Sequence, residues 1–254
     1  MAETILNWEP VAIAVLGGVI PSLVWLWFWL KQDKHYPEPT GLIALSFFAG
    51  MAIVYFVLPL QKLVVASIAP IMNVADLLAQ KFSLIPASEQ TIKITLWAFI
   101  EEFAKYTTVF LIAFKSKHFD EPIDAVVYLI TAALGFAAME NTLYILKDIA
   151  DKETLEMLVN GNMRFIGATI VHIVSSAIVG IAIAFSFYAP RFIKFIAVAI
   201  GILVASMLHA YFNLSIMDSD GTLNTLIVFS KFWAAIIGII ILLALVKRVS
   251  QPAN

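Results

Sequence analysis

The chain has 254 residues, of which 61% are hydrophobic and only 13% are charged, and its formal net charge is −2. A soluble core does not need so much apolar surface, so the composition predicts an all-α, polytopic transmembrane helix bundle, with residues 1–254 forming one integral-membrane domain. The near-neutral charge and the lack of a basic cluster argue against nucleic-acid binding, and we expect no nucleotide cofactor. Because the chain has no cysteine, disulfides and thiolate metal sites are excluded.

Seven apolar stretches are each long enough to cross ~30 Å of hydrocarbon as a helix. They cover residues 11–30, 41–61, 91–114, 125–146, 163–188, 193–217 and 225–246. The first ten residues carry two acids and no base. This composition is unlike that of a cleavable signal peptide, so we expect the first stretch to remain as a helix.

Segment 68–90 differs from these stretches because it is amphipathic, with apolar residues at helical spacing and polar residues between them. This pattern predicts a helix that lies in the membrane interface. The alternative is an eighth span, either short or re-entrant.

The short connections between the spans differ in their content of Lys and Arg, which indicates the orientation. On one side every connection carries two basic residues: Lys31 and Lys34, Lys115 and Lys117, Arg191 and Lys194, and Lys247 and Arg248. On the other side the N-terminal segment and residues 217–224 carry none. We therefore expect a multi-pass protein of the cell (inner or plasma) membrane, with its N-terminus outside and its C-terminus in the cytoplasm.

Ionisable residues occur deep inside four of the apolar stretches, although a charge near the bilayer centre costs roughly 3 kcal/mol to insert. They are Glu101, Glu102 and Lys105 in the third stretch, Glu140 in the fourth, His172 in the fifth and His209 in the sixth. The predicted helix directions place all of them in one layer, roughly 10–15 Å below the outer surface. A shared depth predicts that these side chains meet in one intramembrane site, within the core segment 91–217.

The spacings within the helices add detail to this site. Lys105 follows Glu102 by three residues and Glu101 by four, so it can pair with either carboxylate and leave the other free as a general base. Helix rotation decides which of the two glutamates faces the cavity. Three further pairs at i,i+4 spacing share a helix face: Phe136 with Glu140, His172 with Ser176, and His209 with Asn213.

Two histidines and a carboxylate are ligands that suit zinc, and they leave a fourth position for water. A second carboxylate could take a proton from that water while the metal polarises a carbonyl, which is a peptidase arrangement. The sequence HExxH is absent, so the ligands would come from separate helices.

At these residues the chain resembles the PrsW family of intramembrane proteases, part of a wider group that includes the CAAX prenyl endopeptidases. The matching motifs are EExxK at 101–105, FxxxEN at 136–141, HxxxS at 172–176 and HxxxN at 209–213, and the polar stretch DKHYPEP at 33–39 is also similar. Each motif is short, but four in order, each in its own predicted helix, are specific. The CAAX branch has EExxxR and FxxxH instead, which argues against prenyl-protein processing.

The resemblance implies a membrane-embedded metalloprotease with zinc as its cofactor. It also implies that the enzyme makes the first cut in a membrane-anchored, anti-sigma-factor-like protein near the extracytoplasmic face of the membrane. Relatives in the wider group have also been argued to act through glutamate and histidine without metal, so a metal-free mechanism stays open.

The resemblance further implies roles for the matching residues. Glu101 or Glu102 would be the catalytic base, and Asn213 would orient its neighbours or stabilise an oxyanion. Lys105 would be a further catalytic residue. Glu140, His172 and His209 would bind metal or water. Phe136, Asn141 and Ser176 would support the site.

Other interpretations of the same residues stay open. Buried glutamates and histidines also serve as proton relays, so a proton- or cation-coupled transporter or channel is the main alternative, although residues at one depth do not form a path across the membrane. Lys231 in the last of seven spans would suit a retinal protein, but it lies too close to the start of its span. Taken singly, Glu140 could be a hydrated acid near the surface, Ser176 a packing residue and Asn141 a partner for local polar groups.

Overall fold

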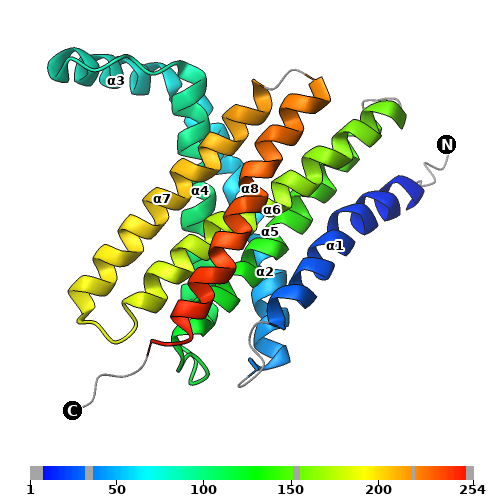
Figure 1. Cartoon of the computed structure of the whole chain (residues 1–254). Coiled ribbons are helices and arrows are strands. Elements are labelled where there is room, and N and C mark those ends of the chain that lie inside the picture. Colours follow the sequence, from blue (N-terminus) through cyan, green and yellow to red (C-terminus); the bar gives the residue numbers. More distant parts are fainter. Residues whose placement is uncertain (1–7, 32–36, 151–154, 219–220, 250–254) are drawn as a thin grey trace, which may run out of the picture.

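The computed structural model describes residues 8–31, 37–150, 155–218 and 221–249. Within these residues the regular structure is entirely helical, and α1 begins and α8 ends at opposite ends of the bundle (Figure 1). The described helices are α1 (Trp8–Leu30), α2 (Thr40–Ala66), α3 (Ile68–Phe82), α4 (Glu89–Ile112), α5 (Pro122–Ala150), α6 (Leu155–Phe185), α7 (Arg191–Met217) and α8 (Gly221–Val246). The predicted all-α bundle is confirmed.

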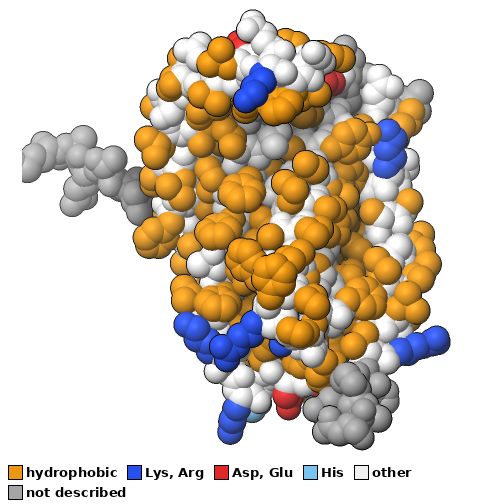
Figure 2. Space-filling view, turned by 90° about the vertical axis from the view of Figure 1, so that its left-hand side faces the viewer, with side chains coloured by type: hydrophobic (Ala, Val, Ile, Leu, Met, Phe, Trp, Pro, Cys, Tyr) orange, Lys and Arg blue, Asp and Glu red, His pale blue; other side chains and the backbone are white. Residues whose placement is uncertain are grey.

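Six of these helices, α1, α2, α5, α6, α7 and α8, are long and apolar enough to cross a membrane. The seventh predicted span is α4, whose charged residues lower its mean hydropathy. It nevertheless runs within the bundle, packed against α2, α5 and α7. Hydrophobic side chains cover the middle of the face shown in Figure 2, and several Lys and Arg side chains gather towards its lower end. This distribution and the six apolar helices are those of a multi-pass membrane protein.

α3 follows α2 after the single residue Ser67 and lies across one end of the bundle rather than along it (Figure 1). A helix of 15 residues is about 22 Å long, too short to cross ~30 Å of hydrocarbon, so α3 is not an eighth span. Its apolar side chains Val74, Leu77, Leu78 and Phe82 are exposed, as expected for a helix that lies in the interface.

α5 is the central helix, because 94% of its most apolar window is buried inside the bundle. Glycines allow α2 to pack against it at backbone distance. A Cβ atom on Gly50 of α2 would meet the backbone carbonyl of Ala132, and one on Gly135 would meet the backbone carbonyl of Phe47. This close approach fixes the position of Glu140, further along α5, relative to α2.

The start of α5 is tied to the segment that precedes α2. Tyr128 donates a hydrogen bond to Glu38, and Asp124 Oδ2 accepts two backbone N–H groups of the preceding loop at 2.7 and 3.0 Å. Of the polar stretch that resembles the PrsW family, residues 33–36 lie outside the described part of the chain. Glu38, which is described, anchors the beginning of α2 to α5.

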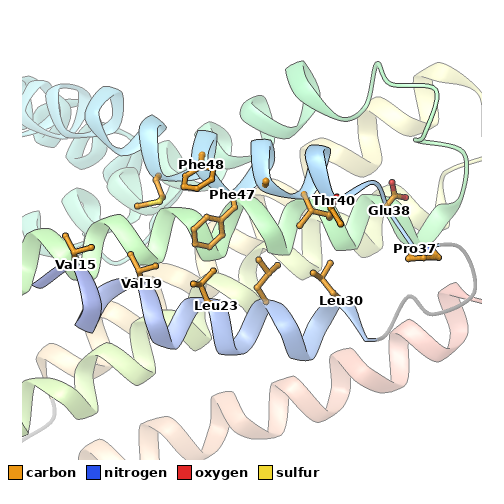
Figure 3. A pocket seen from close by; sticks show the side chains of 13 residues that line it. Val15, Val19, Leu23, Leu30, Pro37, Glu38, Thr40, Phe47 and Phe48 are labelled. Carbon is orange, nitrogen blue, oxygen red and sulfur yellow. The ribbon is translucent and has the colours of Figure 1, made fainter. Parts of the chain in front are cut away.

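An apolar groove of about 600 Å³ runs between α1 and α2, with Pro37 and Glu38 at one end (Figure 3). Apart from Glu38, the residues that line it carry no ionisable side chain. A single carboxylate, already bound by Tyr128, offers little for acid–base or metal chemistry, so the candidate site has to lie elsewhere.

Candidate active site

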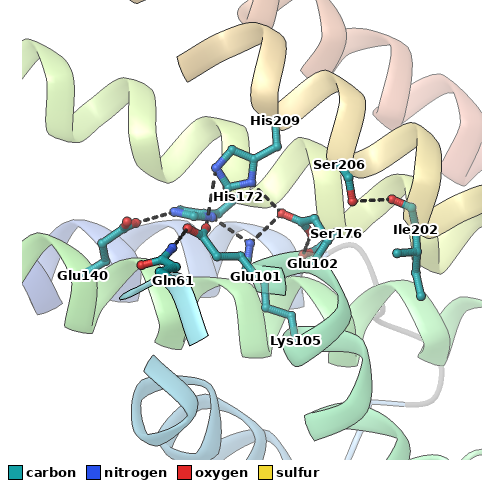
Figure 4. A network of polar contacts seen from close by, with 10 residues as sticks. All are labelled: Gln61, Glu101, Glu102, Lys105, Glu140, His172, Ser176, Ile202, Ser206 and His209. Carbon is teal, nitrogen blue, oxygen red and sulfur yellow. Dashed lines mark hydrogen bonds and ion pairs between the residues drawn. The ribbon is translucent and has the colours of Figure 1, made fainter. Parts of the chain in front are cut away.

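Five helices bring polar side chains together inside the bundle (Figure 4). We refer to this set as the polar cluster: Gln61 from α2; Glu101, Glu102 and Lys105 from α4; Glu140 from α5; His172 and Ser176 from α6; and His209 from α7. All of these side chains except Gln61 and Glu140 are buried. The structure therefore brings into contact the ionisable residues that the sequence places at one depth.

Lys105 is fully buried and lies at the centre of the polar cluster. Its Nζ atom donates to Glu102 Oε1 at 2.7 Å and contacts His172 Nδ1 at 2.8 Å, and it lies 4.8 Å from the centre of the Phe136 ring. Of the two pairings that the spacing allowed, the structure therefore has the i,i+3 pair with Glu102. The charge of Lys105 is matched by one carboxylate and by the face of an aromatic ring.

Glu102 is engaged by three donors. Besides Lys105, His209 Nδ1 lies 2.8 Å from its Oε1 and Ser176 Oγ donates to its Oε2 at 3.2 Å. Because a carboxylate only accepts, His209 Nδ1 carries the hydrogen, and in the neutral imidazole Nε2 is then an acceptor. Ser176 therefore serves as a hydrogen-bond donor to Glu102.

The hydrogen-bond partners of His172 define the opposite tautomer. An ammonium group only donates, so His172 Nδ1 accepts from Lys105, and Nε2 carries the hydrogen. Nε2 lies 2.7 Å from Glu140 Oε2, and it is the donor in that contact. The ring of His172 also packs against those of Phe136 and His209, with centroids 5.3 and 5.0 Å away.

Glu101 has one carboxylate oxygen that is satisfied and one that is not. Oε1 accepts from Gln61 Nε2 at 2.8 Å. Oε2 is buried and has no hydrogen-bond partner among the described residues, and it lies 3.6 Å from His209 Nε2. With a neutral His209 in this tautomer, two acceptors face each other across this gap. Burial of such a pair is costly unless a proton, a water or a cation lies between them.

The donor set fits a metal ion. Glu101, His172 and His209 each offer a ligand atom, and these atoms lie within 4.8 Å of one another. Two imidazoles and a carboxylate are a zinc-type set, and the free Glu101 Oε2 is an oxygen that a cation would satisfy. This grouping contains Glu101 where the sequence pointed to Glu140, whereas Glu140 lies on the other side of His172, against its Nε2.

The remaining predicted residues lie around the polar cluster. Asn213 is half-buried and lines two cavities together with Glu140. Asn141 Nδ2 donates to Thr169 Oγ1 at 3.2 Å, so it bridges α5 and α6. Lys231 is exposed and donates to Tyr211 at 3.2 Å, away from the polar cluster.

Gln61 is the one residue of the polar cluster that sequence reasoning missed. It is the last residue of the second predicted span, where a polar side chain is ordinary for an interfacial position. The signal in the sequence was its place near the end of an apolar helix that was predicted to face outward, on the side of the predicted ionisable layer.

Two cavities reach the polar cluster and share Glu140, Tyr144 and Asn213 as lining residues. One, of about 100 Å³, is lined by Glu140, His172, His209 and Asn213. The other, of about 370 Å³, is lined by Gln61, Glu101, Glu140 and Asn213, and its opposite wall is formed mainly by the apolar side chains Val54, Val57, Leu58, Phe136 and Leu143. Glu101 and Glu140 therefore border a cavity although they lie deep in the bundle, whereas Glu102 lines neither of the two.

Buried glutamates and histidines from separate transmembrane helices, reached by a cavity with an apolar wall, are the groups that an intramembrane hydrolase would need. Residues 38–247 match the model of the PrsW family intramembrane metalloproteases, which covers most of the chain. The chain belongs to this family.

The chain is similar to three proteins named protease PrsW. The one from Geobacillus kaustophilus is 26% identical over 70% of this chain and 67% of its own length. The one from Bacillus subtilis is 26% identical over 52% of this chain and 53% of its own length. The one from Clostridioides difficile is 23% identical over 80% of this chain and 78% of its own length. No solved structure gives a significant match.

The family assignment decides between the functions that the sequence left open. The chain is an intramembrane protease, not a transporter or a channel, and it is a multi-pass membrane protein whose substrate is a membrane-embedded protein.

Proposed function

We propose that the polar cluster is the active site, and that it cleaves a membrane-anchored, anti-sigma-factor-like protein near the extracytoplasmic face of the membrane. The observation that carries this proposal is Glu101 Oε2. It is a buried carboxylate oxygen with no donor in the described part of the chain, it lies beside His209 Nε2, and Glu101 lines the larger cavity. A buried acceptor that is left free in an otherwise satisfied network is suited to bind the attacking water.

Glu101 is the base in this proposal, because Glu102 is already engaged by three donors. A water bound between Glu101 and His209 gives one proton to Glu101 as its oxygen attacks the carbonyl carbon of the substrate. Glu101 then returns that proton to the leaving nitrogen as the C–N bond breaks. Asn213, which borders both cavities, would donate to the carbonyl oxygen as negative charge develops on it.

The predicted ligands His172, His209 and Glu140 would hold zinc, with Glu101 Oε2 beside His209; His172 Nε2, which carries the hydrogen in its contact with Glu140, would have to lose it on metal binding. Zinc, when bound, makes a water easier to deprotonate and polarises the carbonyl. Removal of metal with a chelator is then expected to stop cleavage, and added zinc to restore it. Full cleavage by protein that contains no metal would show that Glu101 and the imidazoles act without it.

The larger cavity would receive the substrate. Its apolar wall, formed in part by Val54, Val57 and Leu58 of α2, suits the side chains at the end of a transmembrane segment. Its polar end holds Glu101 and Gln61. A substrate that unwinds at this end would place a peptide bond beside the free carboxylate oxygen.

The test is cleavage of a single-span reporter protein by the purified chain in liposomes, with products identified by mass spectrometry. We expect Glu101→Gln, His172→Ala and His209→Ala to abolish cleavage while the helical content stays unchanged. Glu89→Gln, an exposed substitution of the same kind on α4, and His118→Ala in the loop after α4 are the matched controls. Wild-type rates in all three active-site variants would refute the proposed site.

The proposed orientation has its own test, which the lack of cysteine makes simple. A single cysteine at Lys117 would lie on the cytoplasmic side and one at Asp218 on the outside. A membrane-impermeant maleimide added to intact cells should therefore label Asp218→Cys and not Lys117→Cys. The reverse pattern would place the polar cluster nearer the cytoplasmic face.

A further inference from the structure

A glutamine that belongs to none of the family motifs contacts the proposed base directly. Gln61, near the end of α2, donates from Nε2 to Glu101 Oε1 at 2.8 Å (Figure 4). Because a carboxylate has only acceptors, the amide has to present its NH2 group to it. Gln61 and Glu101 also line the same cavity.

The backbone of Gln61 is held by the same face of α4. Trp97 Nε1 donates to the backbone carbonyl of Gln61 at 3.1 Å, and Trp97 precedes Glu101 by four residues, about one helical turn. One residue of α2 therefore contacts α4 twice, once through its backbone and once through its side chain. Gln61 cannot move away from Glu101 unless this part of α2 also separates from Trp97.

Gln61 also opposes an alternative pairing of Glu101. Lys105 lies four residues after Glu101, a spacing at which glutamate and lysine pair well on a helix. In the structure Lys105 Nζ contacts Glu102 and His172 instead. The hydrogen bond from Gln61 holds Oε1 of Glu101 towards α2 and leaves Oε2 3.6 Å from His209 Nε2. It thereby determines which oxygen of the proposed base stays free.

We propose that Gln61 is a positioning residue for the cleavage reaction, which holds Glu101 in the conformation that turns Oε2 towards the imidazoles. The inference rests on the role proposed for Glu101. Loss of the amide should lower kcat roughly 10–100-fold, the range expected for the loss of one hydrogen bond to a charged group. KM should change little, because the apolar wall of the cavity is intact.

The experiment compares Gln61→Met, which keeps the length of the side chain but has no donor, with Gln61→Glu, which keeps its size but places a second carboxylate there. The full chain is assayed in liposomes with the single-span reporter, and kcat and KM are determined separately. We expect the kcat of Gln61→Met to fall by the factor above with KM within about twofold, and Gln61→Glu to be at least as slow.

Two controls isolate the contact with Glu101. Gln90→Met makes the same exchange at an exposed position of α4 and should leave both constants within about twofold of the wild type. Leu58→Ala removes part of the cavity wall without touching Glu101 and should raise KM more than it lowers kcat. A kcat for Gln61→Met within about twofold of the wild type, or a rise in KM that accounts for the whole effect, would overturn the inference.

An infrared measurement gives a readout that does not depend on turnover. The carboxylate band of Glu101 is the one that disappears in Glu101→Gln, and it should shift in Gln61→Met because its donor is lost. An unshifted band would refute the contact. If Gln61→Met does not fold, Gln61→Glu serves in both measurements. Full activity of Glu101→Gln would refute the active site itself, whereas an inactive Glu101→Gln with a fully active Gln61→Met would refute only the role of Gln61.

Discussion

Replacement of Lys105 by methionine tests the polar cluster through stability rather than activity. The side chain is fully buried, and its ammonium group contacts Glu102 at 2.7 Å and His172 at 2.8 Å. Methionine has a similar length and fills the same space without a charge. The substitution therefore removes two hydrogen bonds and leaves the carboxylate of Glu102 buried without its cation.

The structure sets the size of the expected effect. A hydrogen bond to a charged group contributes about 1.5–3 kcal/mol, and both contacts of Lys105 involve its ammonium group, so together they account for about 3–6 kcal/mol. Removal of one partner from a buried ion pair costs about 3–5 kcal/mol. Glu102 keeps His209 and Ser176 as donors, so we expect Lys105→Met to lower the free energy of unfolding by about 3 kcal/mol, the low end of that range.

The assay is unfolding of the purified chain in mixed micelles by increasing amounts of a denaturing detergent, followed by tryptophan fluorescence. The double variant Lys105→Met/Glu102→Gln removes the unmatched charge. Its free energy of unfolding should therefore fall by less than the sum of the decreases in the two single variants, with a difference of at least about 1 kcal/mol. A free energy of unfolding of Lys105→Met within about 0.5 kcal/mol of the wild type would show that the buried pair is not formed as described. So would a double variant whose decrease equals the sum of the two single decreases.

Three further substitutions can be measured in the same unfolding assay. Gly50→Val places a side chain against the backbone of α5 and should cost about 1–3 kcal/mol or more, whereas Gly41→Ala, whose Cβ would meet nothing within 4 Å, should stay within about 0.5 kcal/mol of the wild type. Tyr128→Phe removes the hydroxyl that donates to Glu38 and should cost about 1–3 kcal/mol; cleavage should persist, because this contact lies at the opposite end of α5 from the polar cluster. Phe136→Ala should cost about 3–5 kcal/mol, since it empties a fully buried site.

The parts of the molecule that the sequence predicted are those that depend on local composition. Apolar runs of sufficient length mark the spans, because the bilayer requires each backbone to satisfy its own hydrogen bonds as a helix. The amphipathic pattern of 68–90 predicted an interfacial helix, of which the structure has α3 over 68–82, while 89–90 already belong to α4. α6 begins at Leu155, earlier than the predicted residue 163, because a helix can extend beyond the apolar run that reveals it.

The contacts inside the polar cluster depend on helix rotation and on neighbours that are far apart in sequence. Lys105 could reach Glu101 or Glu102, and only the packing of α4 against α6 and α7 selects Glu102. Gln61 is 40 residues from Glu101, and no periodicity in either helix indicates that they meet. Shared depth therefore predicted that the ionisable groups converge, but it did not predict which atom contacts which.

These contacts have a consequence for the two imidazoles. The pair of Lys105 and Glu102 touches both rings, with its cation on His172 and its carboxylate on His209. Because one partner only donates and the other only accepts, the pair imposes opposite tautomers on neutral rings: His172 presents a hydrogen at Nε2 to Glu140, and His209 presents a lone pair at Nε2 towards Glu101. Glu102 would then be indispensable without being the base. Its replacement by glutamine would allow His209 to reverse its tautomer and donate to Glu101 Oε2, so that the free acceptor, and with it the position for the attacking water, would be lost.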